Sequence, residues 1–149
     1  MSISQKCQYA LRAVFELAKR HGGGPTTISD IAKAQAIPPR FLESILGQLR
    51  QGGFVRSQRG IHGGYLLAVD PRSLTVGEII QFIEGPVAPV RCVAADNASN
   101  CPLYGHCAFR DMWLHACDAT KKVYDTTTFQ NLIERDPVFA NRHISNYCI

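Results

Sequence analysis

The sequence has no apolar run that approaches the roughly 20 residues of a transmembrane helix. Its N-terminal segment is amphipathic and includes Glu16, so it lacks the continuous apolar core of a cleavable signal peptide. Internal repeats and low-complexity tracts are also absent, which excludes a repeat architecture. These absences predict a cytoplasmic protein with no membrane partner. In that reducing compartment, the six cysteines are expected to be free thiols or metal ligands, not disulfides.

Acidic residues are scarce in the first half of the chain. Residues 1–72 contain ten Lys and Arg but four Asp and Glu, whereas residues 73–149 contain six and eight. A basic half predicts an anionic partner, with nucleic acid as the first candidate, although a solvated surface has the same composition. A chain of 149 residues is expected to form one domain, or one domain with an appended element.

Three helices are predicted in the first third of the chain. Apolar residues at helical spacing indicate the first at residues 4–20, and the others are expected at about 28–34 and 38–51. The residues expected to set the helix ends are Thr26, Thr27, Pro38, Pro39, Gly52 and Gly53. The inward-facing residues of the third helix are expected to be Phe41, Leu42, Ile45, Leu46 and Leu49. Two short helices, a tight turn and a polar-faced second helix predict a helix-turn-helix.

A hairpin with a basic tip is predicted to follow. Residues 54–57 and 65–69 have the composition of strands, and residues 58–64 between them are rich in glycine. A helix-turn-helix followed by such a hairpin is a winged helix. A capping box formed by Thr75 and Glu78 then predicts a fourth helix.

Residues 108–126 have the pattern of a long amphipathic helix, roughly 28 Å in length at 1.5 Å per residue. No later segment is large enough to cover its apolar face, so a dimer interface is expected, with packing on its own domain as the alternative. The expected fold class is mostly α with a small β-wing, namely a winged helix-turn-helix domain plus a long dimerisation helix. The expected divisions are 1–84 for the DNA-binding domain, 85–107 for a cysteine-containing sensor loop, 108–134 for the dimerisation helix and a short C-terminal helix, and 135–149 for a mobile tail.

The third helix has the length and the polar face to lie in a major groove of DNA. Arg suits the acceptors of guanine, Glu accepts from the cytosine amino group and Gln suits adenine. The wing tip is expected to enter the minor groove through Arg59 and His62, and its glycines let the backbone approach phosphate. The predicted DNA contacts are Pro39, Arg40, Glu43, Ser44, Gln48, Ser57, Arg59, Gly60, His62 and Gly63.

Cys92, Cys101 and Cys107 lie in one irregular stretch, with eight residues between the first two and five between the last two. The stretch contains Pro, Gly, Asn and Asp and is predicted to be a loop. Thiolates are strong ligands for soft metals, and Arg91 and Arg110 would favour the thiolate form. The three cysteines, called the trio below, are therefore a candidate metal or redox site.

Four segments of the chain resemble the Rrf-two (Rrf2) family of bacterial winged-helix repressors. They are YALR at 9–12, ISDIA at 28–32, FLESIL at 41–46 and RGIHGGYLLA at 59–68. The resemblance covers about residues 1–134 and implies a homodimer, built through the long helix, that binds a palindromic operator in double-stranded DNA. It also implies that Glu43 reads a base, that Arg59 acts in the wing and that the trio holds a cluster. That cluster would be [2Fe–2S] or [4Fe–4S], as a sensor of redox state, nitric oxide or iron–sulfur status.

The fourth ligand departs from the family pattern. Some cluster-binding members have a His three residues after the last Cys, where this chain has Arg110. Others use a carboxylate near the start of the first helix, where this chain has Gln8. The remaining candidates are His106, Asp111 and Cys7, although helical spacing places Cys7 on the apolar stripe, as a core residue.

Other chemistries are open to the trio. Zinc favours four N or S ligands, and His106 could complete such a set. Three thiols without a metal could act as a redox switch. A cluster-free regulator could respond to a small metabolite, and a thiol redox protein with a Cys–His106 pair would need no DNA. The favoured hypothesis is a regulator without enzyme activity, a repressor whose DNA affinity depends on the trio.

Overall fold

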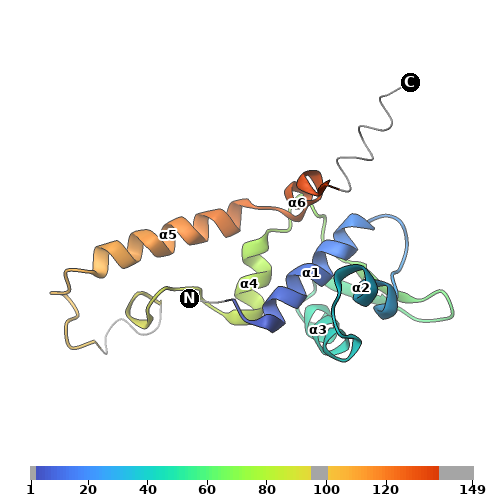
Figure 1. Cartoon of the computed structure of the whole chain (residues 1–149), viewed down its shortest axis with the longest axis horizontal. Helices are drawn as coiled ribbons and strands as arrows, with labels where there is room; N and C mark the ends of the chain where they lie inside the picture. Colours follow the sequence, from blue (N-terminus) through green and yellow to red (C-terminus); the bar gives the residue numbers. More distant parts are fainter. Residues whose placement is uncertain (1–2, 95–100, 138–149) are drawn as a thin grey trace, which may run out of the picture.

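The computed structural model describes residues 3–94 and 101–137, which form six α-helices, one 3-10 turn and a two-stranded antiparallel sheet (Figure 1). In chain order these are α1 (Gln5–Lys19), α2 (Ile28–Gln35), α3 (Pro39–Gln51), β1 (Val55–Gln58), β2 (Gly64–Leu67), α4 (Val76–Glu84), the 3-10 turn η1 (Arg91–Val93), α5 (Arg110–Thr126) and α6 (Phe129–Arg135). The predicted fold class, mostly α with a small β-wing, is confirmed. No helix of the described part is long and apolar enough to cross a membrane.

The helix ends follow the predicted capping residues, with one exception. The side chain of Thr27 caps α2, and Thr75 and Glu78 form the expected reciprocal capping box at the start of α4. Thr26 caps no helix, because its backbone pairs with Tyr65 of β2. This threonine therefore supports the wing.

The first helix, α1, is the central element of the core. It packs against α2, α3, α4, α6 and β2, because its apolar stripe is buried along most of its length. The largest fully buried side chains of the domain are Phe129, Leu17, Ile31, Leu42, Leu46, Leu49, Leu74, Ile79 and Ile80. Each such side chain stabilises the fold by about 1.5–3 kcal/mol. One shared core therefore holds the helix-turn-helix and the wing together.

The last helix, α6, closes this core even though it follows the long helix in sequence. Phe129 is fully buried, Ile133 is nearly so, and the helix packs against α1. The Phe129 N–H donates to the Leu74 carbonyl at 3.0 Å, and the Val76 N–H donates to the Thr127 carbonyl at 2.9 Å. The sequence pattern predicted the helix but not this docking, which returns the chain from α5 to the core around α1.

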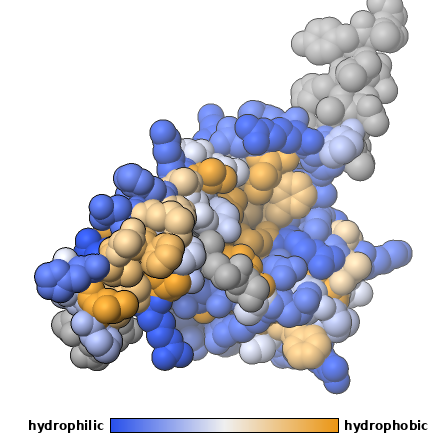
Figure 2. All heavy atoms as spheres, turned by 60° about the vertical axis from the view of Figure 1, so that its left-hand side comes forward, coloured by the Kyte–Doolittle hydropathy of each residue, from blue (hydrophilic) through white to orange (hydrophobic). Residues whose placement is uncertain are grey.

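The long helix, α5, contacts α4 and η1 and otherwise extends away from the domain (Figure 1). None of its residues is buried, and Phe109, Met112 and Val123 are 63%, 49% and 61% exposed. Figure 2 shows hydrophobic side chains gathered on the face of the molecule that carries α5. The long amphipathic helix predicted at residues 108–126 is thus present as α5, Arg110–Thr126, and residues 3–94 and 101–137 leave its apolar face uncovered.

A buried carboxylate links α1 to α2. Glu16 is 3% exposed and accepts hydrogen bonds from Arg20 Nε at 2.7 Å and from Gln35 Nε2 at 2.8 Å. Lys19 Nζ lies 3.2 Å from the same carboxylate and 3.6 Å from Asp136, beyond the end of α6. Burial alone would raise the pKa of Glu16, but the hydrogen bonds from Gln35, Arg20 and Lys19 outweigh it, so the pKa is lowered from 4.5.

This network makes stability depend on pH. Because the pKa of Glu16 is lower in the folded chain than in the unfolded chain, its contribution is present above about pH 4.5 and is lost as the pH falls further. We expect Glu16→Gln to lower the free energy of unfolding by about 2 kcal/mol at pH 7 and to remove this part of the acid dependence. Urea denaturation between pH 3 and pH 7 measures both effects.

The exposed carboxylate of Glu134, on α6, provides the control. Glu134→Gln should change the free energy of unfolding by less than about 0.5 kcal/mol at either pH. Equal acid dependence in wild type and Glu16→Gln would show that the buried network does not stabilise the fold through its charge.

Candidate nucleic-acid interface

The helix-turn-helix presents the polar face of α3 to solvent. Ala36 takes the left-handed conformation, with φ of 49°, and turns the chain from α2 into α3. Pro38 and Pro39 then start α3 where a missing N–H is tolerated. Of the predicted contacts on this helix, Gln48 is half-buried, and the exposed ones are Pro39, Arg40, Glu43 and Ser44. The buried side of the helix is formed by Leu42, Ile45, Leu46 and Leu49.

Phe41 is a correction to the sequence prediction, which placed it in the core. The side chain is 45% exposed, and its ring centroid lies 6.3 Å from that of Tyr9 on α1. The guanidinium carbon of Arg40 lies 4.7 Å from the centre of the Phe41 ring. Helical spacing places Phe41 at the edge of the apolar stripe, where Tyr9 of α1 lies beside the ring but leaves 45% of the residue exposed. The first turn of α3 therefore carries an aromatic ring and a cation side by side.

The wing tip is exposed and depends on its glycines. Arg59, Gly60 and His62 are exposed, as is Ile61, which no sequence pattern singled out. Gly60 has a φ of 109°, which favours glycine. A Cβ on Gly63 would lie 2.2 Å from the carbonyl oxygen of Gln58, so the fold of the tip itself requires this glycine.

Two polar contacts fix the wing relative to the helices. The backbones of Thr26 and Tyr65 exchange hydrogen bonds of 2.9 and 2.8 Å, and Gly64 allows this approach because a Cβ there would lie 2.5 Å from the Thr26 oxygen. Near the end of α3, Arg50 Nη1 donates to Ser57 Oγ of β1 at 3.3 Å. As a result α2, α3 and the hairpin lie at the end of the molecule away from the free end of α5 (Figure 1).

The three cysteines of the trio lie in two separate segments of the described chain. Cys92 lies in η1, Cys101 and Cys107 lie in the irregular segment before α5, and all three are half-buried free thiols. Their soft sulfur donors suit an iron–sulfur cluster. Among residues 3–94 and 101–137, however, no three His, Cys, Asp or Glu side chains lie close enough to hold a metal together. The donor types fit a cluster, whereas their arrangement in this structure does not.

The candidate fourth ligands, Cys7, His106 and Asp111, likewise form no metal-binding group with the trio among the described residues. Cys7 is fully buried, and burial together with the nearby Glu84 carboxylate raises its pKa to about 11, so it stays a protonated core thiol. This confirms the core prediction for Cys7. His106 and Asp111 are exposed on either side of Cys107.

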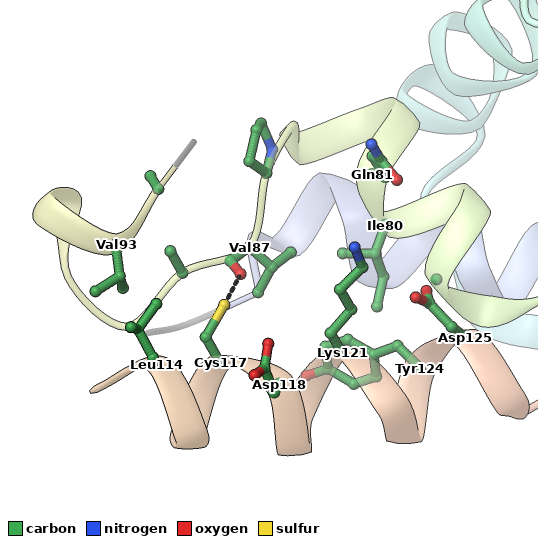
Figure 3. A pocket seen from close by; sticks show the side chains of 14 residues that line it. Ile80, Gln81, Val87, Val93, Leu114, Cys117, Asp118, Lys121, Tyr124 and Asp125 are labelled. Carbon is green, nitrogen blue, oxygen red and sulfur yellow. Dashed lines mark hydrogen bonds between the residues drawn. The ribbon is translucent and has the colours of Figure 1, made fainter. Parts of the chain in front are cut away.

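A cavity of about 300 Å³ lies between α4, α5 and the segment that leads to η1 (Figure 3). Cys117 of α5 lines it and donates from Sγ to the Val87 carbonyl at 3.4 Å, which fastens that segment to the helix. Lys121, Asp118 and Tyr124 also point from α5 into the cavity. The cavity thus lies where α4 meets the long helix α5.

The chain is similar to known transcriptional regulators in both sequence and structure. The transcriptional regulator CymR of Bacillus subtilis is 38% identical over 132 residues, which is 89% of this chain and 89% of the relative. Its solved structure, described as that of the global cysteine regulator, matches with a TM-score of 0.76 and covers 89% of this chain and 95% of that one.

Other regulators match over similar lengths. The transcriptional regulator IscR of Escherichia coli is 30% identical over 138 residues, 93% of this chain and 83% of the relative. The oxidised form of CymR from Staphylococcus aureus is 33% identical, with a TM-score of 0.69 and coverage of 89% and 95%. A family model described as Rrf2, an iron-dependent transcriptional regulator, matches residues 3–135. By this match and these identities, the chain belongs to the Rrf2 family of transcriptional regulators.

Proposed function

We propose that this regulator acts as a homodimeric repressor that binds a palindromic operator in double-stranded DNA. The observation that carries the proposal is that α3 and the wing form a common surface. Hydrogen bonds between Thr26 and Tyr65, and between Arg50 and Ser57, fix the wing relative to the helices. Arg40, Arg50 and Arg59 are exposed on these elements, and the first 72 residues contain ten Lys and Arg against four Asp and Glu. An exposed helix face with Arg40 and an adjacent wing tip with Arg59 suit a major groove and its neighbouring minor groove.

Specific residues have distinct roles in this proposal. Arg40, beside the Phe41 ring, is positioned to donate to guanine, and Glu43 to accept from cytosine. Gln48 suits adenine, and Arg59 at the wing tip suits a narrow minor groove. Ser57 already accepts from Arg50, so it is better placed for positioning the wing than for reading a base.

A selection from random duplexes tests DNA binding. We expect the wild type to select two half-sites about 10–10.5 base pairs apart, or a multiple of that spacing. Glu43→Ala should relax discrimination at one symmetric base-pair position by about tenfold, and Arg59→Ala should weaken binding by about tenfold with a shallower salt dependence. Lys122→Ala on α5 should leave both unchanged. Equal affinity for selected and random duplexes would contradict sequence-specific binding.

The dimer is proposed to form through α5. Its apolar side chains Met112 and Val123 lie on a helix that the described part of the chain does not bury. An exposed apolar face of this kind marks an association surface, and two copies of one helix suit an isologous contact. Two joined recognition helices then bind two half-sites with far higher affinity than one.

Charge introduced on α5 tests the dimer. The variant Met112→Asp with Val123→Asp should be monomeric by sedimentation and should bind the selected duplex about a hundredfold more weakly. Its circular dichroism should match the wild type, because neither residue contributes to the buried core. Lys122→Ser is the control and should stay dimeric. A dimeric double variant would place the interface elsewhere.

We also propose that the trio senses through an iron–sulfur cluster. The support is the donor chemistry of three free thiols in one loop, together with the family description as iron-dependent. Binding would require the three thiols to come together from their present positions. The loop lies between α4 and α5, so gathering its cysteines would change the contact between these helices.

Anaerobic purification tests the cluster. We expect a brown protein that contains iron and sulfide, and we expect Cys92→Ala to lose both and to change operator affinity. Cys117→Ser, which alters a cysteine outside the trio, should keep the iron and sulfide. A colourless wild type without iron, together with unaltered operator affinity in Cys92→Ala, would exclude the cluster as the sensor.

A second candidate is a cluster-free regulator that responds to a thiol oxidant or a small metabolite. The cavity between α4 and α5 favours the metabolite, since its volume is within the range of small-ligand sites. The solved structure of CymR from Bacillus subtilis is described as that of a global cysteine regulator, and a separate structure of CymR from Staphylococcus aureus is of an oxidised form. Operator binding that survives loss of all three trio thiols would favour the metabolite.

A further inference from the structure

The middle of α3 contains a glycine, Gly47, for which the described residues show no packing requirement. Its backbone is helical and is not among the glycines with positive φ. A Cβ added there would meet no described atom within 4 Å. Glycine inside a helix is unfavourable relative to alanine, because it leaves the unfolded chain more conformational freedom. The described chain therefore offers no structural reason for this residue.

Other glycines of the domain have such a reason. Gly77, the other glycine inside a described helix, is buried against α5, and a Cβ there would lie 2.1 Å from Asp125 Oδ1. Gly63 and Gly64 face backbone oxygens at 2.2 and 2.5 Å from the position of a Cβ. Packing explains these three residues, whereas no contact within the described residues explains Gly47.

The position of Gly47 on α3 indicates which partner would approach it. It is one turn beyond Glu43 and Ser44, on the side of α3 opposite its buried residues. We propose that Gly47 is the point of closest approach between α3 and the floor of the DNA major groove. Without a side chain there, the helix backbone can lie against the edge of a base pair, which brings Glu43 and Ser44 within reach of the bases. This inference rests on the proposed function of DNA binding.

The variants Gly47→Ala and Gly47→Gln separate stability from binding. Both should raise Tm by about 2–5 °C at equal protein concentration, because Ala and Gln favour a helix. Both should nevertheless weaken binding to the duplex that the wild type selects, by about fivefold for Ala and more than about twentyfold for Gln. Affinity for a random-sequence duplex should stay within about twofold, because non-specific binding depends on phosphate contacts.

Ala34→Gly, at an exposed position of α2, is the matched reverse change. It should lower Tm and leave the affinity for the selected duplex unchanged, which shows that helix stability by itself does not set affinity. Gly47 variants that bind the selected duplex as tightly as the wild type would overturn the inference while leaving DNA binding intact. Gly47 variants with a lower Tm would also overturn it, because the fold would then require the glycine. A wild type that selects no duplex would instead refute the proposed function.

Discussion

Burial of the apolar stripe of α1 is the contact on which the rest of the structure depends. This helix packs against α2, α3, α4, α6 and β2, so both DNA-facing elements and the helix that leads to α5 share one core. The side chains around it are fully buried Leu, Ile and Phe residues, each of which stabilises the domain by about 1.5–3 kcal/mol. The buried Glu16 adds a polar link from the same helix to the end of α2. Because α3 and α4 both pack against α1, movement of one relative to the other would disturb the contact of at least one of them with α1.

The proposed DNA-facing surface, formed by α3 and the wing, is held in place by hydrogen bonds from other elements. Thr26 holds the wing through paired backbone hydrogen bonds, and Arg50 joins α3 to β1. Such contacts orient the polar face of α3 before any DNA is bound, which lowers the ordering cost of binding. Gly47 does not stabilise this surface, since no described atom lies within 4 Å of the position of its Cβ. The proposed close approach of a base pair accounts for a glycine there.

The junction between α4 and α5 connects the two proposed activities. The Cys117–Val87 hydrogen bond fastens the segment that carries Cys92 to the long helix, and a cavity lies beside it. Beyond α5, the chain returns to the core through Phe129. Whether a cluster, an oxidant or a metabolite is the signal, a change at this junction would reach the domain through α4, which packs on both α1 and α5, and through α6, which follows α5. In a dimer it would alter the spacing of the two recognition helices, and operator half-sites demand a fixed spacing.

Local signals in the sequence determined much of the fold. The period of the apolar residues predicted α1 to α3 and the long helix, and the Thr75–Glu78 pair predicted the start of α4. Residue type identified the trio as soft metal donors and placed Cys7 in the core. These features depend on neighbours a few residues apart, so one sequence is enough to predict them.

Tertiary structure decided the contacts between distant segments. The docking of Phe129, the exposure of Phe41 and the pairing of Thr26 with Tyr65 each depend on an element far away in the chain. Helical period tells which residues share a face, but it does not tell what covers that face or how far the cover extends. For the same reason, the sequence named three thiols as possible ligands, and only their positions in space could show that the described chain does not bring them together.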